Sequence, residues 1–335
     1  MKKLLFGAIV LSFMSACNSD NISNQNEEST DPAVSSSSMA LERSCPSEEI
    51  REEALKNSPE LRQKFADLEA NTARFANDQK LGRVLADGTV EIPVVVNVIY
   101  SSTAGNVSDA RIAEQIAVLN ADYSGTNTDA GSIPTEFQTV KAGDTKVQFR
   151  LVNTIRKSTT KTSWKTDDSM KKASSGGIDA TNPTNYLNIW VVSKMTSQGK
   201  SILGYATFPE SAGSLNDGVV IAAPFFGKTG ASSPYNLGRT ATHEVGHYLN
   251  LRHIWGDAMC GNDLVDDTPT QTSSNGGAPT YPLYNTCNSV KRSVMFMNYM
   301  DYVNDASMFM FSSGQKTRMQ AVVAASGARA GLRVL

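Results

Sequence analysis

The three histidines of this chain stand close together, at positions 243, 247 and 253. Histidines four residues apart share one face of an α-helix, so His243 and His247 can reach the same ion. His253 would point away from that face on a continuous helix, so the helix has to end before it. We expect the turn at Asn250, because asparagine tolerates the left-handed backbone conformation best after glycine. The spacing therefore predicts a metal centre where a helix ends.

Three imidazoles with one open coordination position are typical of a catalytic zinc site. Bound zinc lowers the pKa of its water molecule to about 7 and polarises a carbonyl group. Glu244 follows the first histidine directly, and it is the candidate to take the proton of that water molecule. The alternatives are a structural metal site, which usually has four ligands and favours cysteine, and three unrelated histidines on one helix.

The charge balance of the chain argues against one class of partner. The 335 residues include 31 Lys and Arg and 33 Asp and Glu, a net charge of -2. A protein that binds nucleic acid through a basic surface carries an excess of positive charge, so no nucleic-acid partner is expected. Charged residues make up 19% of the chain, below the share of about 25% usual in soluble proteins. This composition favours an exported, loop-rich protein.

The N-terminus has the features of an export signal. Two lysines precede an apolar run from Leu4 to Met14, which has the length of a signal peptide and is too short to span a membrane. The run ends in Ser15-Ala16-Cys17, which resembles the bacterial lipobox. We expect residues 1–16 to be a signal peptide and Cys17 to carry a lipid that anchors the protein to a membrane. The alternative is an ordinary signal peptide, with Cys17 incidental.

Two further segments precede the main domain. Residues 17–40 are polar and serine-rich, and they predict a flexible, lipid-anchored tether. Residues 41–84 are rich in charge and predict a helical segment, because Ser58-Pro59 is a typical helix start. Apolar residues recur at helical spacing after it: Leu61, Phe65, Leu68 and Phe75.

Residues 85–335 predict a single domain of α+β class. Strands come first together with helices, and an irregular, turn-rich portion follows Arg252. Strands are expected at 91–100, 146–155, 187–192, 202–208 and 219–223, and helices at 110–119 and 312–325.

The segment from His243 to His253 closely resembles the zinc signature of metzincin metalloproteases, with Asn250 where that family has glycine. Other stretches resemble the pappalysin family, the metzincin branch with ulilysin and the cytophagalysins. These stretches are Leu203–Pro209, Asp217–Ile221, Ile254–Asp257, Asp263–Pro269 and Asn298–Tyr302. The resemblance implies a metzincin fold, with a twisted mixed sheet and backing helices above a cleft and an irregular C-terminal subdomain below it.

The resemblance also implies roles for residues after the zinc signature. Met300 would lie in a tight turn beneath the histidines, and Tyr302 would offer its hydroxyl to the oxyanion of the tetrahedral intermediate. Met297 and Tyr299 have the same spacing and define a competing register. Cys260 and Cys287 look like one of the disulfides of the family, the alternative being two free thiols.

An oxygen-rich cluster in the irregular portion suggests a second metal. Carboxylate and hydroxyl oxygens suit calcium, and the family resemblance implies structural calcium here. The candidate ligands are Asp263, Asp266 and Thr268, with Asp267 beside them. The alternative is a solvated acidic loop.

Cys45 is the odd thiol once the other cysteines are assigned. Its position resembles that of the cysteine in a family pro-segment, which occupies the open zinc position and keeps the enzyme latent; Pro46 stands where the family has glycine. A cut between about Lys80 and Leu85 would remove this inhibitor and also release the enzyme from its lipid anchor. The alternatives are an exposed thiol without a role and a thiol that pairs with another molecule.

The sequence therefore predicts an exported zinc endopeptidase that is made as a latent precursor, acts on protein or peptide substrates and is a monomer. A zinc amidase acting on a non-protein amide and a non-catalytic surface-binding lipoprotein are the rival interpretations. Family members that cut beside Arg or Lys have an acidic residue where this chain has Ala306. No preference for basic substrates is expected on that ground.

Overall fold

The computed structural model of the protein describes residues 42–80 and 88–333. The expected signal peptide, Cys17, the tether and residues 81–85 of the expected cleavage segment lie outside the described residues. All described residues belong to the unit that begins at Leu41. None of their helices is both long enough and apolar enough to cross a membrane.

In the described residues, two helices precede the first strand, one helix separates β1 from β2, and seven strands run from β2 to β8 before α4. The α-helices are α1 (Ser47–Asn57), α2 (Pro59–Lys80), α3 (Asp109–Ser124), α4 (Arg239–Tyr248) and α5 (Ser313–Val323). The strands are β1 (Val90–Tyr100), β2 (Val147–Ser158), β3 (Trp164–Lys165), β4 (Leu187–Val192), β5 (Met195–Ser197), β6 (Lys200–Ile202), β7 (Gly204–Ala206), β8 (Val219–Ala222), β9 (Tyr284–Cys287) and β10 (Val290–Ser293). Short 3-10 turns include η5 (Pro209–Ser211) and η7 (Asp305–Ser307).

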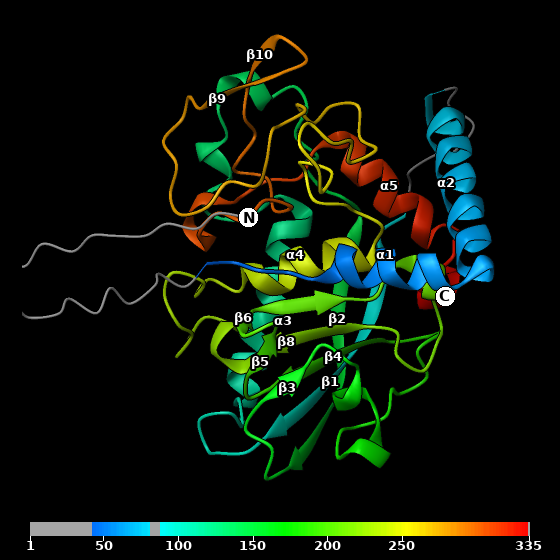
Figure 1. The fold of residues 1–335 in the computed structure, drawn as a ribbon, viewed down its shortest axis with the longest axis vertical. Coiled ribbons are helices and arrows are strands. Elements are labelled where there is room, and N and C mark those ends of the chain that lie inside the picture. The colour runs from blue at the N-terminus through cyan, green and yellow to red at the C-terminus, as the bar shows by residue number, and fades with distance from the viewer. Residues whose placement is uncertain (1–41, 81–87, 334–335) are drawn as a thin grey trace, which may run out of the picture. The chain divides into compact units, whose positions relative to one another are not determined.

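A five-stranded mixed sheet organises the domain, in the order β2-β1-β4-β8-β7 (Figure 1). Strands β2, β1, β4 and β8 pair in parallel, and β7 pairs antiparallel to β8 at the edge. The expected α+β class with a mixed sheet is therefore confirmed.

Both faces of the central strands are buried, as in parallel sheets covered on two sides. Along β4, Ile189 and Val191 belong to a core shared with α3, α4 and the C-terminal portion. Trp190 and Val192 point to the opposite face, into a second core. Because successive strand residues face opposite sides, a near-continuous apolar run is needed here, and the sequence Leu187–Val192 supplies it.

Two differences from the sequence prediction have physical reasons. The expected strand 202–208 is divided: β6 pairs with β5 in a separate small sheet, and β7 joins the main sheet. Helix α1 was not foreseen as a separate helix, because its buried face includes the polar residues Ser47, Glu48 and Arg51. When the buried face of a helix is polar, the sequence lacks the apolar residues at helical spacing from which the helix could be predicted.

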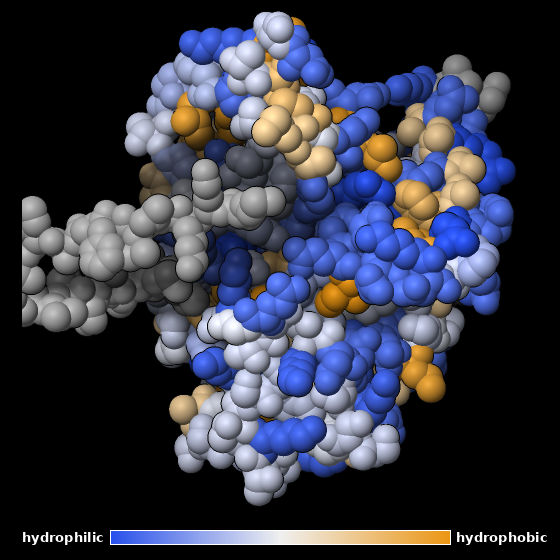
Figure 2. Space-filling view, in the orientation of Figure 1, coloured by the Kyte–Doolittle hydropathy of each residue, from blue (hydrophilic) through white to orange (hydrophobic). Residues whose placement is uncertain are grey.

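Helices α1 and α2 lie against the rest of the domain (Figure 1). Arg318 of α5 forms an ion pair with Glu69 of α2 at 2.7 Å. The outward surface of these two helices is mostly hydrophilic (Figure 2), while Leu55 and Leu68 are buried.

Candidate metal centre

Helix α4 carries two of the histidines and ends where the sequence predicts. All ten of its residues are buried. After Tyr248 the backbone turns at Asn250, which has a φ of 72°, and the amide of Leu251 donates to Gly246 O at 2.9 Å. The left-handed turn at Asn250 is therefore confirmed, and it brings His253 back toward α4.

Four donor atoms converge at the end of this turn. One ligand atom each from Cys45, His243, His247 and His253 lies within 4.8 Å of all the others, and all four residues are buried. The Nε2 atoms of His247 and His253 are 3.2 Å apart. The Nε2 atom of His243 is buried without a hydrogen-bond partner.

The opposite ring nitrogens are all held by neighbouring oxygens. Nδ1 of His243 lies 2.7 Å from Tyr299 O, and Nδ1 of His247 lies 2.8 Å from Leu251 O. A carbonyl oxygen can only accept, so each Nδ1 carries the proton and each Nε2 presents a lone pair. His253 has Asp257 in the same role, at 2.6 Å from Nδ1.

The electrostatics favour neutral imidazoles. Burial lowers the pKa of His253 to about 4 and lowers the pKa of His243 and His247 well below the ordinary value. A buried set of neutral imidazoles with oriented lone pairs and a thiol suits zinc. The residues present therefore fit a zinc ion.

Glu244 lies beside the cluster and contacts the N-terminal segment. Its Oε2 accepts from the thiol of Cys45 at 3.1 Å and from the hydroxyl of Ser47 at 3.2 Å. Burial raises the pKa of this carboxyl to about 8. A side chain at Gly204 of β7 would meet Glu244 Cγ at 2.7 Å, so the edge strand passes directly over the carboxylate.

Of the two possible registers after the third histidine, the structure places Met300 against α4. A side chain at Gly246 would meet Met300 Sδ at 2.5 Å, which explains why glycine stands between the two helical histidines. The hydroxyl of Tyr302 donates to Cys45 O at 2.9 Å and accepts from Cys45 N at 3.2 Å. Tyr299 supplies its carbonyl oxygen to His243 instead.

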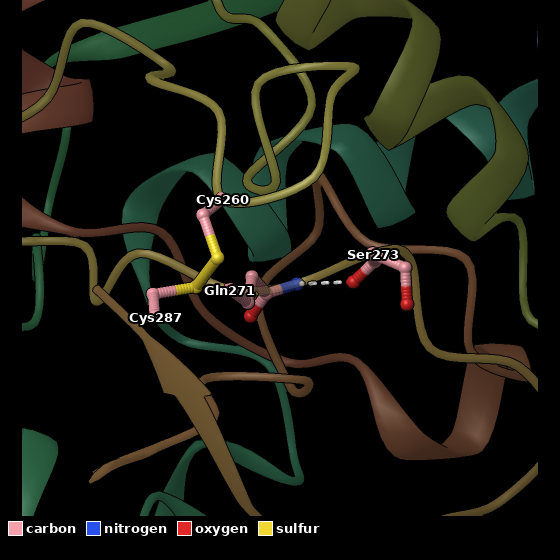
Figure 3. The surroundings of a disulfide bond; sticks show 4 residues. All are labelled: Cys260, Gln271, Ser273 and Cys287. Atoms are coloured by element: carbon pink, nitrogen blue, oxygen red, sulfur yellow. Dashed lines mark hydrogen bonds between the residues drawn. A yellow bond between two sulfur atoms is a disulfide. The ribbon is translucent and has the colours of Figure 1, made fainter. Parts of the chain in front are cut away.

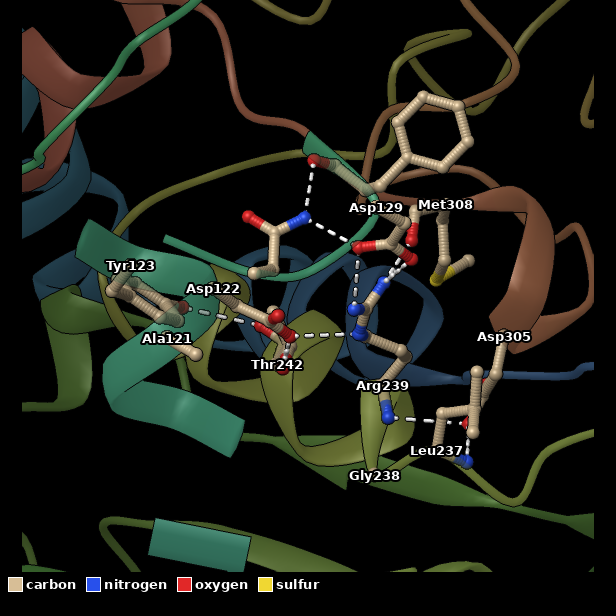
Figure 4. A network of polar contacts seen from close by, with 12 residues as sticks. Ala121, Asp122, Tyr123, Asp129, Leu237, Gly238, Arg239, Thr242, Asp305 and Met308 are labelled. Atoms are coloured by element: carbon tan, nitrogen blue, oxygen red, sulfur yellow. Dashed lines mark hydrogen bonds and ion pairs between the residues drawn. The ribbon is translucent and has the colours of Figure 1, made fainter. Parts of the chain in front are cut away.

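The start of α4 is fixed by a buried polar network (Figure 4). Arg239 pairs with Asp122 at 3.0 Å and with Asp129 at 3.1 Å. Asp305 accepts from the amides of Leu237 and Arg239 through Oδ2, at 2.8 and 3.2 Å. The network links α3, α4 and η7, and so it holds the histidine-bearing helix against the C-terminal portion.

The other carboxylate oxygen of Asp305 binds the N-terminal segment. Nη2 of Arg43 lies 2.6 Å from Asp305 Oδ1, and both side chains are almost completely buried, at 1% and 0% exposed. Arg43 also lies over the ring of Tyr235, 4.9 Å from its centroid. Arg43 therefore fills a polar pocket two residues along the chain from Cys45.

A disulfide joins Cys260 to Cys287, as expected (Figure 3). The loop that it closes is tied to the turn below the histidines. Oδ2 of Asp301 accepts from Gln271 Nε2 at 3.0 Å and from Asn275 Nδ2 at 2.6 Å. The bridge therefore stabilises a loop that positions the residues next to Met300.

The four residues of the expected calcium cluster differ in their burial and contacts. The hydroxyl of Thr268 donates to Asp263 Oδ2 at 2.8 Å, and burial raises the pKa of Asp263 to about 7. Asp266 is exposed. Asp267 accepts from Gly314 N at 2.8 Å and thereby binds the first turn of α5.

Several residues of the site were missed from the sequence. Asp257 stands in the quoted stretch Ile254–Asp257, and its spacing of four from His253 was a usable signal. Asp305 directly precedes Ala306. Arg43 and Ser47 flank Cys45, but only their contacts with residues about 160 to 260 positions away reveal their place.

Comparisons with known proteins agree with this geometry. A family model described as pregnancy-associated plasma protein-A matches residues 173–324. An extracellular metalloprotease of Uncinocarpus reesii is 34% identical over 263 residues, which cover 75% of this chain and 82% of that protein. One of Pyricularia oryzae is 32% identical over 300 residues, 87% of this chain and 92% of that protein.

Two solved structures resemble the whole domain. A mutant of Tannerella forsythia promirolysin has a TM-score of 0.75 at 39% identity and covers 87% of this chain and 97% of its own. Mature mirolysin of the same organism, in complex with a cleaved peptide, has a TM-score of 0.70 at 40% identity. It covers 74% of this chain and 97% of its own. The precursor form thus matches the larger share of this chain.

Proposed function

Because the chain belongs to the pappalysin family of metalloproteases, we propose that it is an exported zinc endopeptidase whose precursor is held latent by Cys45. The fold is that of a metzincin, as the similarity to mirolysin shows. The observation that carries the proposal is the cluster of one thiol and three imidazoles within 4.8 Å. Residues 41–84 form the pro-segment and residues 85–335 the catalytic domain.

The three histidines and Glu244 have different roles in peptide hydrolysis. His243, His247 and His253 hold the ion. Zinc bound there supplies Lewis acidity, which polarises a carbonyl group and acidifies water. Glu244, once freed from Cys45 and Ser47, takes a proton from the attacking water molecule and returns it to the leaving amine.

Tyr302 stabilises the oxyanion of the substrate. Its hydroxyl donates to a peptide carbonyl already, that of Cys45 at 2.9 Å. When the pro-segment has left, the same hydroxyl can donate to the carbonyl of the scissile bond, where negative charge develops. Met300 supports the histidines from below through its contact with Gly246.

Latency is supported by the contacts of Cys45. The thiol is buried among the imidazoles and donates to Glu244. It therefore takes the ligand position that water would occupy, and it also engages the carboxylate that would accept the proton of that water. Thiolate is a good zinc ligand, and zinc lowers the pKa of a thiol that it binds. Neither water nor a substrate can reach the centre while Cys45 is seated there.

Edge strand β7 is the proposed partner of extended substrate. Its residue Ala206 donates its amide to Ser47 Oγ of the pro-segment at 2.9 Å, so this edge offers a hydrogen-bond donor to whatever lies in the cleft. The complex of mature mirolysin with a cleaved peptide supports a peptide substrate for this chain.

The pocket of Arg43 revises the expected specificity. Ala306 led to no expected preference for basic residues, but the acidic residue of this chain is Asp305, one position earlier. A buried carboxylate that already binds a guanidinium favours arginine or lysine in the substrate. We therefore propose a preference for a basic side chain next to the scissile bond.

Asp305→Asn tests this preference in the processed enzyme. Asparagine keeps an oxygen for the amides of Leu237 and Arg239 but removes the charge. The kcat/KM for a peptide with arginine in the pocket should fall about 100-fold, and that for the matched norleucine peptide should stay unchanged. An equal fall for both peptides would make Asp305 a purely structural residue.

A calcium ion bound by Asp263, Asp266 and Thr268 is the second proposed metal. The buried carboxylate of Asp263 supports it, because burial without a cation disfavours the charged form. A ligand that binds only the native state stabilises it by mass action. A calcium-selective chelator that spares zinc should lower the Tm by about 5 °C or more. An unchanged melting curve would remove the calcium site.

The homologous enzymes are extracellular, which supports export of this chain. We propose in addition that Cys17 anchors the precursor to a membrane, on the periplasmic or cell-surface face, and that the protein is a monomer. The pro-segment lies between this anchor and the catalytic domain. One cut between about Lys80 and Leu85 would then activate the enzyme and release it.

The rival functions predict different substrates. A zinc amidase would hydrolyse a cell-wall peptide but not a protein, and a non-catalytic lipoprotein would hydrolyse neither. Clearing of casein by the processed protein, lost when a chelator is added, separates the endopeptidase from both rivals. Hydrolysis of a cell-wall peptide separates the two rivals from each other.

A further inference from the structure

A second arginine of the pro-segment, Arg51, is seated on the catalytic domain at another acidic residue. Its Nε donates to Glu210 Oε1 at 2.7 Å, and the two side chains are 2% and 3% exposed. Its guanidinium carbon lies 4.3 Å from the centroid of the Phe208 ring. A carboxylate together with an aromatic face is a typical seat for a cation.

Cleavage of the precursor would remove Arg51 and leave the two residues that bind it, Glu210 and Phe208, on the catalytic domain. Glu48, which pairs with Arg51 at 3.2 Å, belongs to the pro-segment and departs with it. Within the described parts of the chain, Arg51 is the residue whose side chain donates to Glu210, and Glu210 Oε2 is buried without a partner. The processed enzyme therefore retains a carboxylate that has lost its hydrogen-bonded counter-ion, beside the ring face of Phe208 that Arg51 had covered. Buried Arg329 of the catalytic domain still interacts electrostatically with Glu210 but pairs with Asp217.

The Glu210–Phe208 pair and the pocket of Asp305 lie near opposite ends of α4. Asp305 binds amides at the start of α4. The ring of Phe208 packs on His247, near the end of α4, with centroids 5.1 Å apart. Cys45 lies between Arg43 and Arg51 in the chain and occupies the metal centre between the two seats.

From these contacts we propose that Glu210 and Phe208 form a second cation-binding subsite in the processed enzyme. The subsite takes an arginine or lysine side chain of the substrate, on the opposite side of the scissile bond from the residue that enters the Asp305 pocket. The inference rests on the proposed function and adds a second recognition element to it.

The path from Cys45 to Arg51 sets the position of that residue. Pro46 has φ -87° and ψ 14°, so the chain already turns into helix α1 there. One extended and five helical steps from Cys45 to Arg51 span roughly 11 Å. A fully extended substrate covers this distance in about three residues. The basic residue should therefore lie about three to five positions from the scissile bond.

The test uses enzyme processed from the full chain and peptides that keep arginine in the Asp305 pocket. Lysine is compared with norleucine at each of two to six positions on the other side of the bond. One position, about three to five residues away, should show a KM about tenfold lower for lysine, with little change in kcat. Equal KM values at every position would overturn the subsite.

Glu210→Gln then identifies the residue responsible. It should abolish the difference between lysine and norleucine at that position and leave the preference of the Asp305 pocket intact. Glu91→Gln, a change to a half-exposed carboxylate on β1 that pairs with Arg150, is the matched control and should retain both preferences.

Persistence of the lysine preference in Glu210→Gln would contradict the assignment. If that variant does not fold, the comparison of peptides on the wild-type enzyme still decides whether the subsite exists. If the enzyme cleaves the peptides but does not distinguish lysine from norleucine at any of these positions, only the second subsite is contradicted. If it cleaves none of the peptides, the proposed function itself is contradicted.

Discussion

Replacing Glu244 with alanine is expected to lower kcat for peptide hydrolysis about 1000-fold. The substitution removes the group that accepts the proton of the attacking water molecule and leaves the three histidines in place. The Nδ1 partners of the histidines, Tyr299 O, Leu251 O and Asp257, do not involve Glu244. Zinc content and fold should therefore be retained, and both are measured beside kcat by metal analysis and melting.

The variant has to be processed by added active enzyme, because a precursor that cannot cut itself would be inert for a second reason. Glu91→Ala, in which a half-exposed carboxylate at the start of β1 is lost, serves as the matched control and should keep full activity. A fall of less than about tenfold in kcat for Glu244→Ala would mean that another group is the base.

Replacing Cys45 with alanine should produce a precursor that is active before cleavage. Alanine cannot bind zinc, and it also frees Glu244 from the thiol that donates to it at 3.1 Å. The uncleaved, soluble precursor should hydrolyse peptides early and cut itself near Lys80 to Leu85. Early activity and the appearance of the shortened chain are followed together over time.

The early activity of the Cys45→Ala precursor should stay below that of the processed enzyme, because other contacts keep the pro-segment on the catalytic domain. Arg43, Arg51 and Glu69 still hold it at Asp305, Glu210 and Arg318. Ser44→Ala, one position away from the thiol, is the control and should stay latent. A Cys45→Ala precursor as inert as the wild type would end the proposal of thiol latency. Full activity of membrane-bound material would end the coupling of activation to release.

The sequence predicted the metal centre because its determinants are local. The spacing of His243 and His247 depends only on the helical period, and the return of His253 depends only on a turn at Asn250. The structure places all three as expected. Strands such as Leu187–Val192 were equally local, because burial on both faces leaves a continuous apolar run.

The contacts between the pro-segment and the catalytic domain could not be predicted in this way. Arg43 and Asp305 are separated by 262 positions, and neither stands in a periodic pattern. Burial of charged side chains is rare without a partner, but a sequence does not show which charges are buried. The expectation drawn from Ala306 considered one position of the chain, whereas the ion pair of Arg43 with Asp305 makes the neighbouring position the candidate for binding a basic side chain.

The central claim is that the three histidines hold a zinc ion with which this chain hydrolyses protein. Casein clearing by the processed enzyme tests it most directly, with zinc content measured on the same sample. The account predicts clearing that is lost when a chelator removes zinc and that returns when zinc is restored. Absence of clearing by processed protein that contains zinc, or clearing that persists after zinc has been removed, would contradict it.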